Sequence, residues 1–214
     1  MNSEMIIQII KEVQKAYEAN ASEIEKLDQA IGDGDHVFNM KRGILAILEI
    51  DKELVSLNPG QALNKIGMTL LSSIGGAAGP LFASMFMGMA KVADSKELDN
   101  YGTLAEMVSS GVQLVKQRGK ADVGDKTMLD VLIPVSELFS ELAERNDLSK
   151  NDMLRQLKAE AERGMLSTKD IVATRGRASY LGERAKGHID PGARSCQLFV
   201  FTICDYLMDQ EENK

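Results

Sequence analysis

Hydrophobic positions recur every three to four residues over most of the 214-residue chain, which is the spacing of amphipathic helices. The first apolar stripe consists of Met5, Ile6, Ile9, Ile10, Val13 and Tyr17, opposite Lys11, Glu12 and Lys15. Similar stripes follow at about residues 40–50, 58–70, 79–89, 103–115, 127–144, 149–169 and 191–207. Because no segment shows a convincing strand pattern, we predict an all-α fold of eight helices.

Residues that favour helix starts precede several of these stripes. Asn58 followed by Pro59 combines an N-cap with proline at the first helical position. Ser149 is a second N-cap, and Pro191 opens the last stripe. Thr103, with a glutamate three residues later, has the spacing of a capping box. We expect helices to begin at these four places.

Two stretches interrupt the helical pattern. Residues 75–79 (Gly-Gly-Ala-Ala-Gly) form a flexible elbow, and residues 171–190 form a basic loop with Arg175, Arg177, Arg184 and Lys186. Loops near 20 residues are uncommon in compact domains and usually carry function. A basic loop in an acidic chain suggests a cover over an anion. Since no repeat or linker divides the sequence, we expect residues 1–214 to form a single domain.

The charge balance limits the partners. The chain has 25 Lys+Arg against 32 Asp+Glu, a net charge of −7, and a pI of about 5.0, which argues against broad nucleic-acid binding. No apolar run reaches the roughly 18 residues of a membrane span, and the first residues lack a basic leader region. Cys196 and Cys204 lie about 12 Å apart along a helix, so we expect two buried thiols in a cytoplasmic protein.

Three carboxylates fall within eight residues, at Asp28, Asp33 and Asp35. Gly32 and Gly34 flank the middle one and let the backbone turn sharply. Three unpaired carboxylates in one turn repel each other, and oxygen ligands suit a hard cation such as Mg²⁺. The ligand spacing of an EF-hand is absent. A solvated Asp-Gly turn is the alternative that this motif alone leaves open.

Two nucleotide-binding motifs are matched only in part. Residues 32–37 lack the third glycine of the dinucleotide fingerprint and follow a helix, and in residues 119–127 Asp125 interrupts a Walker A loop. The elbow precedes a helix N-terminus, which favours anions, although close helix packing would also use such small residues. Together, the carboxylates, the elbow and the basic loop predict a site for a metal and a polyphosphate. His36 fits a hydrogen-bonding contact better than a phosphoryl carrier, because its neighbours are acidic.

Four blocks of residues carry a family resemblance. They are Ile31 to His36 with Asn39 and Met40; Gly75 and Gly76 with Gly79, Pro80 and Leu81; Gly124 to Met128 with Asp130 and Pro134; and Gly176 to Arg184 with Asp190 to Ala193. In this order, over essentially the whole chain, they resemble the ADP-binding L subunits of phosphoenolpyruvate-dependent dihydroxyacetone kinases, the DhaL family. The resemblance implies an eight-helix antiparallel up-and-down barrel with a nucleotide site at one end.

The resemblance also implies roles for individual residues. Asp28, Asp33 and Asp35 would hold two Mg²⁺ ions, and Arg177 would neutralise charge on the transferred phosphoryl group. ADP or ATP would contact His36, Val37, Phe38, Asn39, Gly75, Gly76, Ala77, Ala78, Gly119, Met128, Arg177, Asp190, Pro191 and Gly192. Within this set, Gly119 and Met128 would lie near the adenine, and Arg177 with residues 190–192 would cover the nucleotide.

Family members of this type keep ADP bound, receive a phosphoryl group from a phosphotransferase-system M subunit and pass it to a substrate on a separate K subunit. Dihydroxyacetone or a similar small ketose or polyol is therefore the expected acceptor. Two departures stand out: Val37 replaces a glycine, and Ala78 replaces a serine in the elbow. An alternative is a nucleotide-sensing partner of a transcription regulator that does no chemistry. The related fatty-acid kinase domains are disfavoured, because Gly32 and His36 break their Pro-Asp-Gly-Asp-Thr-Gly motif.

Overall fold

A computed structural model describes residues 1–145 and 147–212, and the regular structure of this part of the chain consists of helices, without strands. Its α-helices are α1 (Ser3–Ile31), α2 (His36–Glu49), α3 (Asp51–Val55), α4 (Pro59–Ser73), α5 (Ala78–Ala93), α6 (Tyr101–Gly119), α7 (Leu129–Ala143), α8 (Lys150–Ser167) and α9 (Pro191–Glu212). Two 3₁₀ helices, η1 (Thr168–Asp170) and η2 (Arg177–Ala185), connect α8 to α9. The predicted all-α class is confirmed.

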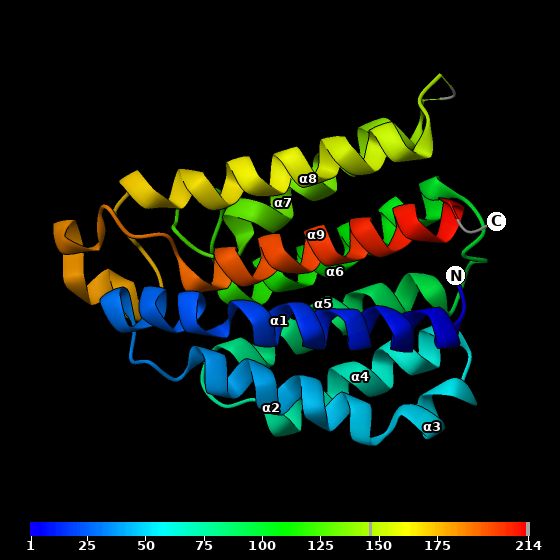
Figure 1. Cartoon of the computed structure of the whole chain (residues 1–214), viewed down its shortest axis with the longest axis horizontal. Coiled ribbons are helices and arrows are strands. Elements are labelled where there is room, and N and C mark those ends of the chain that lie inside the picture. The colour runs from blue at the N-terminus through cyan, green and yellow to red at the C-terminus, as the bar shows by residue number, and fades with distance from the viewer. Residues whose placement is uncertain (146, 213–214) are drawn as a thin grey trace.

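The eight longer helices close into a ring. Each packs against the next in the order α1, α2, α4, α5, α6, α7, α8 and α9, and α9 returns to α1. Figure 1 shows these helices running lengthwise, with both chain termini at one end and the basic loop at the other. The expected eight-helix up-and-down barrel is therefore confirmed. The short helix α3 adds a ninth helix in the described residues, and its five residues are too few to give a periodic pattern.

Capping explains where most helices begin. Asn58 caps α4 in a capping box with Gln61, Ser149 caps α8, and α9 begins at Pro191, as predicted. The predicted cap at Thr103 is wrong. Asn100 caps α6 instead, because its side chain accepts a 2.8 Å hydrogen bond from the Thr103 amide.

The sequence pattern also misplaced parts of two segments. Helix α1 continues past its predicted stripe to Ile31, so that Asp28 lies in its last turn and not in a loop. The basic loop is not irregular throughout, since residues 177–185 form the 3₁₀ helix η2, with a kink at Gly182. Asp28 and the basic loop therefore both have a defined backbone.

One large apolar core fills the ring of helices, and a small second cluster lies under the basic loop. Cys196 and Cys204, 2% and 3% exposed, belong to the large core as free thiols, which confirms their predicted burial. The second cluster consists of Ile31, Ala173, Ala178 and Ala185, with Leu181 packed against it. It joins the end of α1 to the basic loop. Among the described helices, none is long and apolar enough to cross a membrane.

Candidate functional site

The candidate residues gather at the end of the barrel opposite the chain termini. The end of α1, the start of α2, the basic loop and the start of α9 meet there, at the left of Figure 1. These segments form two pairs that are each continuous in sequence, the end of α1 with the start of α2 and the basic loop with the start of α9, and the two pairs are far apart along the chain. The barrel thus presents loops and helix ends, not helix faces, at this position.

Asp28, Asp33 and Asp35 converge at this end. One carboxylate oxygen from each lies within 4.8 Å of the others. Asp28 is buried, whereas Asp33 and Asp35 are exposed. Three oxygen donors so arranged fit a hard cation such as Mg²⁺ better than a softer metal.

The two glycines of this turn have different functions. A Cβ at Gly32 would lie 1.9 Å from Asp28 Oδ1, so only glycine leaves room for that carboxylate. Gly34 has a φ of +77°, a backbone conformation that other residues rarely adopt. Together they let Asp33 and Asp35 turn back toward Asp28.

His36 fixes the start of α2. Its backbone amide donates a 3.0 Å hydrogen bond to Asp28 Oδ2, and its Nε2 lies 2.8 Å from the Ser195 hydroxyl. The Tyr17 hydroxyl is 3.4 Å from the same Ser195 oxygen. Burial lowers the pKa of His36, although Asp28 and Asp35 oppose this shift. The lowered pKa favours the neutral imidazole, and within this network His36 is a hydrogen-bonding group.

The residues after His36 point in different directions. Val37 is buried in the main core, so the side chain that replaces the family glycine does not fill the site. Phe38 is 66% exposed, with the Arg42 guanidinium 5.4 Å from its ring centre. Asn39 is buried and accepts a 2.9 Å hydrogen bond from Arg42. Asn39 turns toward the elbow, since its Oδ1 would lie 3.4 Å from a Cβ at Gly75.

The elbow lies beside Asn39. A Cβ at Gly75 would be 3.4 Å from Asn39 Oδ1, which shows how closely the two approach. Gly76 and Ala77 are exposed, which does not agree with the helix-packing alternative for those positions. Ala77 caps α5 without a side-chain hydrogen bond. The first amides of α5, including that of Ala78, thus have no side-chain acceptor from their cap.

The basic loop reaches over the acidic turn. Arg177 Nη2 lies 2.9 Å from Asp33 Oδ2 in an ion pair, and both side chains are partly exposed. The loop is also attached to residues 120–128: Arg175 donates a 2.8 Å hydrogen bond to the Lys120 carbonyl, and the Thr174 side chain and amide bind Asp125. These contacts bring a cation to the edge of the carboxylate cluster.

The start of α9 completes this end of the barrel. The Asp190 carboxylate accepts a 2.7 Å hydrogen bond from the Ala193 amide. Burial raises the pKa of Asp190 to about 7, although nearby Lys126 lowers it. Gly192, which follows Pro191, faces Met128, since a Cβ there would lie 3.7 Å from Met128 Cβ.

Gly119 lies at the same end of the barrel as these residues but at a different position. A Cβ at this position would lie 3.3 Å from Leu81 Cδ2, near the start of α5. Gly119 is therefore close to the helix that follows the elbow, whereas Met128 is close to the start of α9.

Sequence reasoning missed two buried polar residues beside the site. Lys126 is 1% exposed and donates hydrogen bonds to the Thr168 and His188 carbonyls, on the two segments (the stems) that enter and leave the basic loop. Ser195 is fully buried and lies between His36 and Tyr17, within hydrogen-bond distance of both. Lys126 lies within the Gly124–Met128 motif block, but that motif does not indicate its burial, and Ser195 lies in no motif. Asp130, present in the motif blocks, folds the loop before α7 by accepting 2.7 Å hydrogen bonds from the amides of Gly124 and Thr127.

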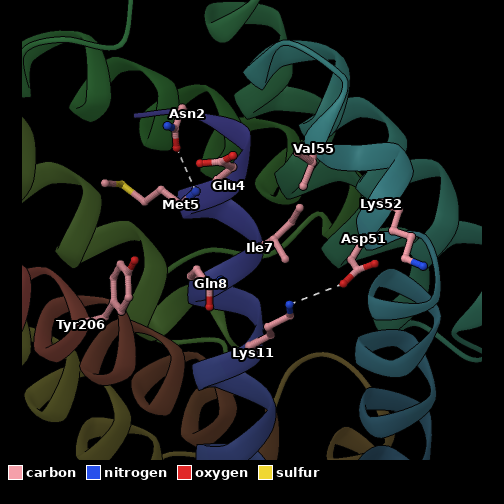
Figure 2. Close-up of a pocket in the computed structure, with 10 residues that line it drawn as sticks. All are labelled: Asn2, Glu4, Met5, Ile7, Gln8, Lys11, Asp51, Lys52, Val55 and Tyr206. Atoms are coloured by element: carbon pink, nitrogen blue, oxygen red, sulfur yellow. Dashed lines mark hydrogen bonds and ion pairs between the residues drawn. The ribbon is translucent and has the colours of Figure 1, made fainter.

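Two surface hollows lie outside the carboxylate cluster. A groove of about 760 Å³ runs beside α2 from Phe38 to Glu49, with Ser72 to Gly75 on its other side, and so reaches the elbow. Figure 2 shows the second, of about 470 Å³, near the N-terminus. It is lined by Asn2, Glu4, Met5, Ile7, Gln8, Lys11, Asp51, Lys52, Val55 and Tyr206. Lys11 and Asp51 pair across it at 3.5 Å, and it holds none of the predicted site residues.

This chain is similar in sequence to known ADP-binding kinase subunits. The family model described as "DAK2 domain" matches residues 30–205. The ADP-binding subunit DhaL of PEP-dependent dihydroxyacetone kinase 1 from Listeria innocua is 39% identical, over 86% of each chain. The ADP-binding subunit DhaL of PEP-dependent dihydroxyacetone kinase from Escherichia coli K12 is 42% identical, over 81% of this chain and 82% of the relative.

A solved structure shares the fold. The dihydroxyacetone kinase of C. freundii in its native form superposes with a TM-score of 0.73 at 20% identity, over 94% of this chain. This chain spans about a third, 34%, of that longer one. The family match and the two subunits similar over most of their length show that the chain belongs to the DAK2 domain family, together with the DhaL subunits of dihydroxyacetone kinases.

Proposed function

We propose that the chain, as a single L domain of residues 1–214, is the ADP-binding subunit of a cytoplasmic PEP-dependent dihydroxyacetone kinase. It holds Mg²⁺ with ADP or ATP and transfers the phosphoryl group to dihydroxyacetone, or a similar small ketose or polyol, on a separate K subunit. A phosphotransferase-system M subunit then restores the phosphoryl group. The observation that carries the proposal is the convergence of Asp28, Asp33 and Asp35 within 4.8 Å, with Arg177 paired to Asp33.

The names of similar proteins support the ligands. The Listeria and E. coli relatives are named as ADP-binding subunits, and a C. freundii dihydroxyacetone kinase was solved with AMP-PNP and Mg²⁺. In this chain the three aspartates would hold two Mg²⁺ ions. Bound Mg²⁺ would neutralise the phosphate oxygens and so permit an anion beside three carboxylates.

The backbone supplies the contacts for the phosphates and the ribose. The start of α2, beyond the His36 amide that Asp28 already accepts, and the elbow with Ala78 lie at two helix N-termini, where partial positive charge favours an anion. Gly119 and Met128 would flank the adenine, and residues 190–192 would close the site from the start of α9.

Arg177 has the catalytic function in this proposal. Its guanidinium already lies at the edge of the carboxylate cluster, on a loop that Ile31 and the alanines of the second apolar cluster hold against α1. A planar guanidinium binds phosphate oxygens with two parallel hydrogen bonds. Arg177 would therefore orient the terminal phosphoryl group and stabilise the charge that develops during transfer.

The test is transfer of labelled phosphate from phosphoenolpyruvate to dihydroxyacetone with cognate K and M subunits. We expect labelled dihydroxyacetone phosphate only when this chain, ADP and Mg²⁺ are all present. Turnover with ATP and no M subunit would contradict the phosphoenolpyruvate-dependent type. Binding of ADP without any transfer would overturn the catalytic proposal and favour a nucleotide-sensing partner of a transcription regulator.

A further inference from the structure

Lys126 is a buried cation that the proposed function leaves unused. It lies in the loop between α6 and α7, it is 1% exposed, and its φ is +61°. A lysine is unfavourable both in the protein interior and in the left-handed region of the backbone. Its position therefore depends on contacts that repay both costs.

Those contacts are with the two stems of the basic loop. The Lys126 ammonium donates one hydrogen bond to the Thr168 carbonyl, where α8 gives way to η1. It donates a second, of 2.5 Å, to the His188 carbonyl, just before α9. One side chain thus connects the segments that enter and leave the loop, 20 residues apart in sequence.

The stems are also bonded to each other. The Gly187 amide donates to the Lys169 carbonyl at 2.8 Å, and the Asp190 amide donates to the Thr168 hydroxyl at 3.0 Å. Both are neutral hydrogen bonds, weaker than those of a charged donor. We call the four hydrogen bonds that join the two stems the clasp, and Lys126 is its charged donor.

Negative charge around the clasp favours a cation there. Burial lowers the pKa of Lys126, and the nearby Asp190, Asp170 and Asp130 oppose this shift because their negative charge favours the ammonium. Removal of the ammonium would leave two carbonyls without their donor and these acidic groups without a nearby counter-charge. The stems would then separate more readily.

We propose that Lys126 is a positioning residue that clasps the two stems of the basic loop and thereby holds Arg177 over the acidic turn. Separation of the stems would release η2, which carries Arg177 between them. For a bound nucleotide, Lys126 would set the rate of release. This last step rests on the proposed function, whereas the clasp itself does not.

Limited trypsin digestion tests the clasp without any nucleotide. The basic loop offers four exposed cleavage sites, at Arg175, Arg177, Arg184 and Lys186. We expect Lys126→Met to be cut in this loop about tenfold faster than the wild type, because local opening exposes the backbone. Lys116→Met is the matched control. It removes a partly exposed lysine of α6 that pairs with Asp122, and it should be cut at the wild-type rate.

Lys126→Gln keeps the test decisive if the methionine variant does not fold. Glutamine retains a polar donor without the charge, so we expect a cleavage rate between those of the wild type and Lys126→Met. The far-UV circular dichroism of every variant compared must remain that of the wild type. A folded Lys126→Gln or Lys126→Met protein that is cut at the wild-type rate would overturn the clasp.

Release of a fluorescent ADP derivative in the presence of Mg²⁺ then separates the two proposals. Faster release from Lys126→Met, by about tenfold, with unchanged thermal stability would support positioning over a purely structural role. If loop cleavage accelerates but release does not, the nucleotide part of this inference is wrong. If the wild type binds no ADP derivative, the proposed function fails and the clasp is judged by cleavage alone.

Discussion

The two loops that meet at the candidate site are held in place in opposite ways. The acidic turn between α1 and α2 depends on its own neighbours, since Gly32 and His36 both donate their amides to Asp28. The basic loop of residues 171–190 depends on distant segments: Lys126 and residues 120–125 bind it, and Ile31 supports it from below. One loop is a local structure and the other is a tertiary one.

This difference suggests that the acidic turn and the basic loop have different functions. A turn fixed by adjacent residues holds its carboxylates in place whether or not the rest of the site is assembled. A loop held by a few remote contacts can open with little cost to the barrel. We therefore expect changes in the acidic turn to affect binding most, and changes in the basic loop to affect transfer and exchange.

The largest effect is expected from Asp33→Ala, which removes a carboxylate of the acidic turn and the partner of Arg177. Affinity for ADP in the presence of Mg²⁺ should fall more than about 100-fold, because losing even a group that supports a ligand costs about 10–100-fold. Isothermal titration calorimetry measures this change. Asp51→Ala, which removes an ion pair with Lys11 near the N-terminus, is the control and should bind normally. Wild-type affinity in Asp33→Ala would refute the metal assignment.

Arg177→Ala removes the ion pair with Asp33 that joins the basic loop to the acidic turn. We expect the rate of phosphoryl transfer to fall on the order of 100-fold, the effect of removing one group that stabilises charge in a transition state. ADP affinity should change much less, because the three carboxylates remain. Arg177→Lys retains the charge without the planar fork and should recover part of the rate. Equal losses of affinity and rate would argue that Arg177 only binds the nucleotide.

Asp190→Asn addresses the stem of the basic loop. Between about pH 4 and 7 the folded chain keeps a proton on Asp190 that the unfolded chain has released, since burial raises the pKa from 3.8 to about 7. The free energy of unfolding of the wild type should therefore fall as pH rises through this range, relative to the variant, by about 3 kcal/mol. Asparagine still offers an oxygen to the Ala193 amide. Urea unfolding at several pH values measures the difference, and parallel pH profiles would contradict the raised pKa.

The smallest effect is expected from Ala78→Ser, which restores the hydroxyl that the family usually has in the elbow. One added hydrogen bond to a phosphate should tighten ADP binding about five- to tenfold, near 1 kcal/mol. Titration with and without Mg²⁺ measures it. Ala93→Ser, at the other end of the same helix, is the matched control. An unchanged affinity would place the elbow away from the phosphates.

Sequence patterns were sufficient for the parts of the molecule that depend on local interactions. Helical periodicity and the caps at Asn58 and Ser149 predicted the helices, and the clustered aspartates and glycines predicted the acidic turn, whereas the barrel was expected only from the family resemblance. The Thr103 cap was wrong because two good capping residues lie close together, and the side chain of Asn100 takes the available amide.

The rest depended on contacts between segments distant in sequence. The burial of Lys126 follows from its two carbonyl acceptors in the stems of the basic loop, 42 and 62 residues away. The His36–Ser195 contact spans 159 residues. A single sequence shows such residues as ordinary polar positions, because nothing in their own neighbourhood signals the partner.

Native mass spectrometry of the wild-type protein tests the central claim most directly, namely that the acidic turn and the basic loop enclose a magnesium-bound nucleotide. After gel filtration with ADP and Mg²⁺, we predict a mass increase equal to one ADP plus magnesium, lost when magnesium is chelated. A protein that shows only its own mass under these conditions would contradict the account.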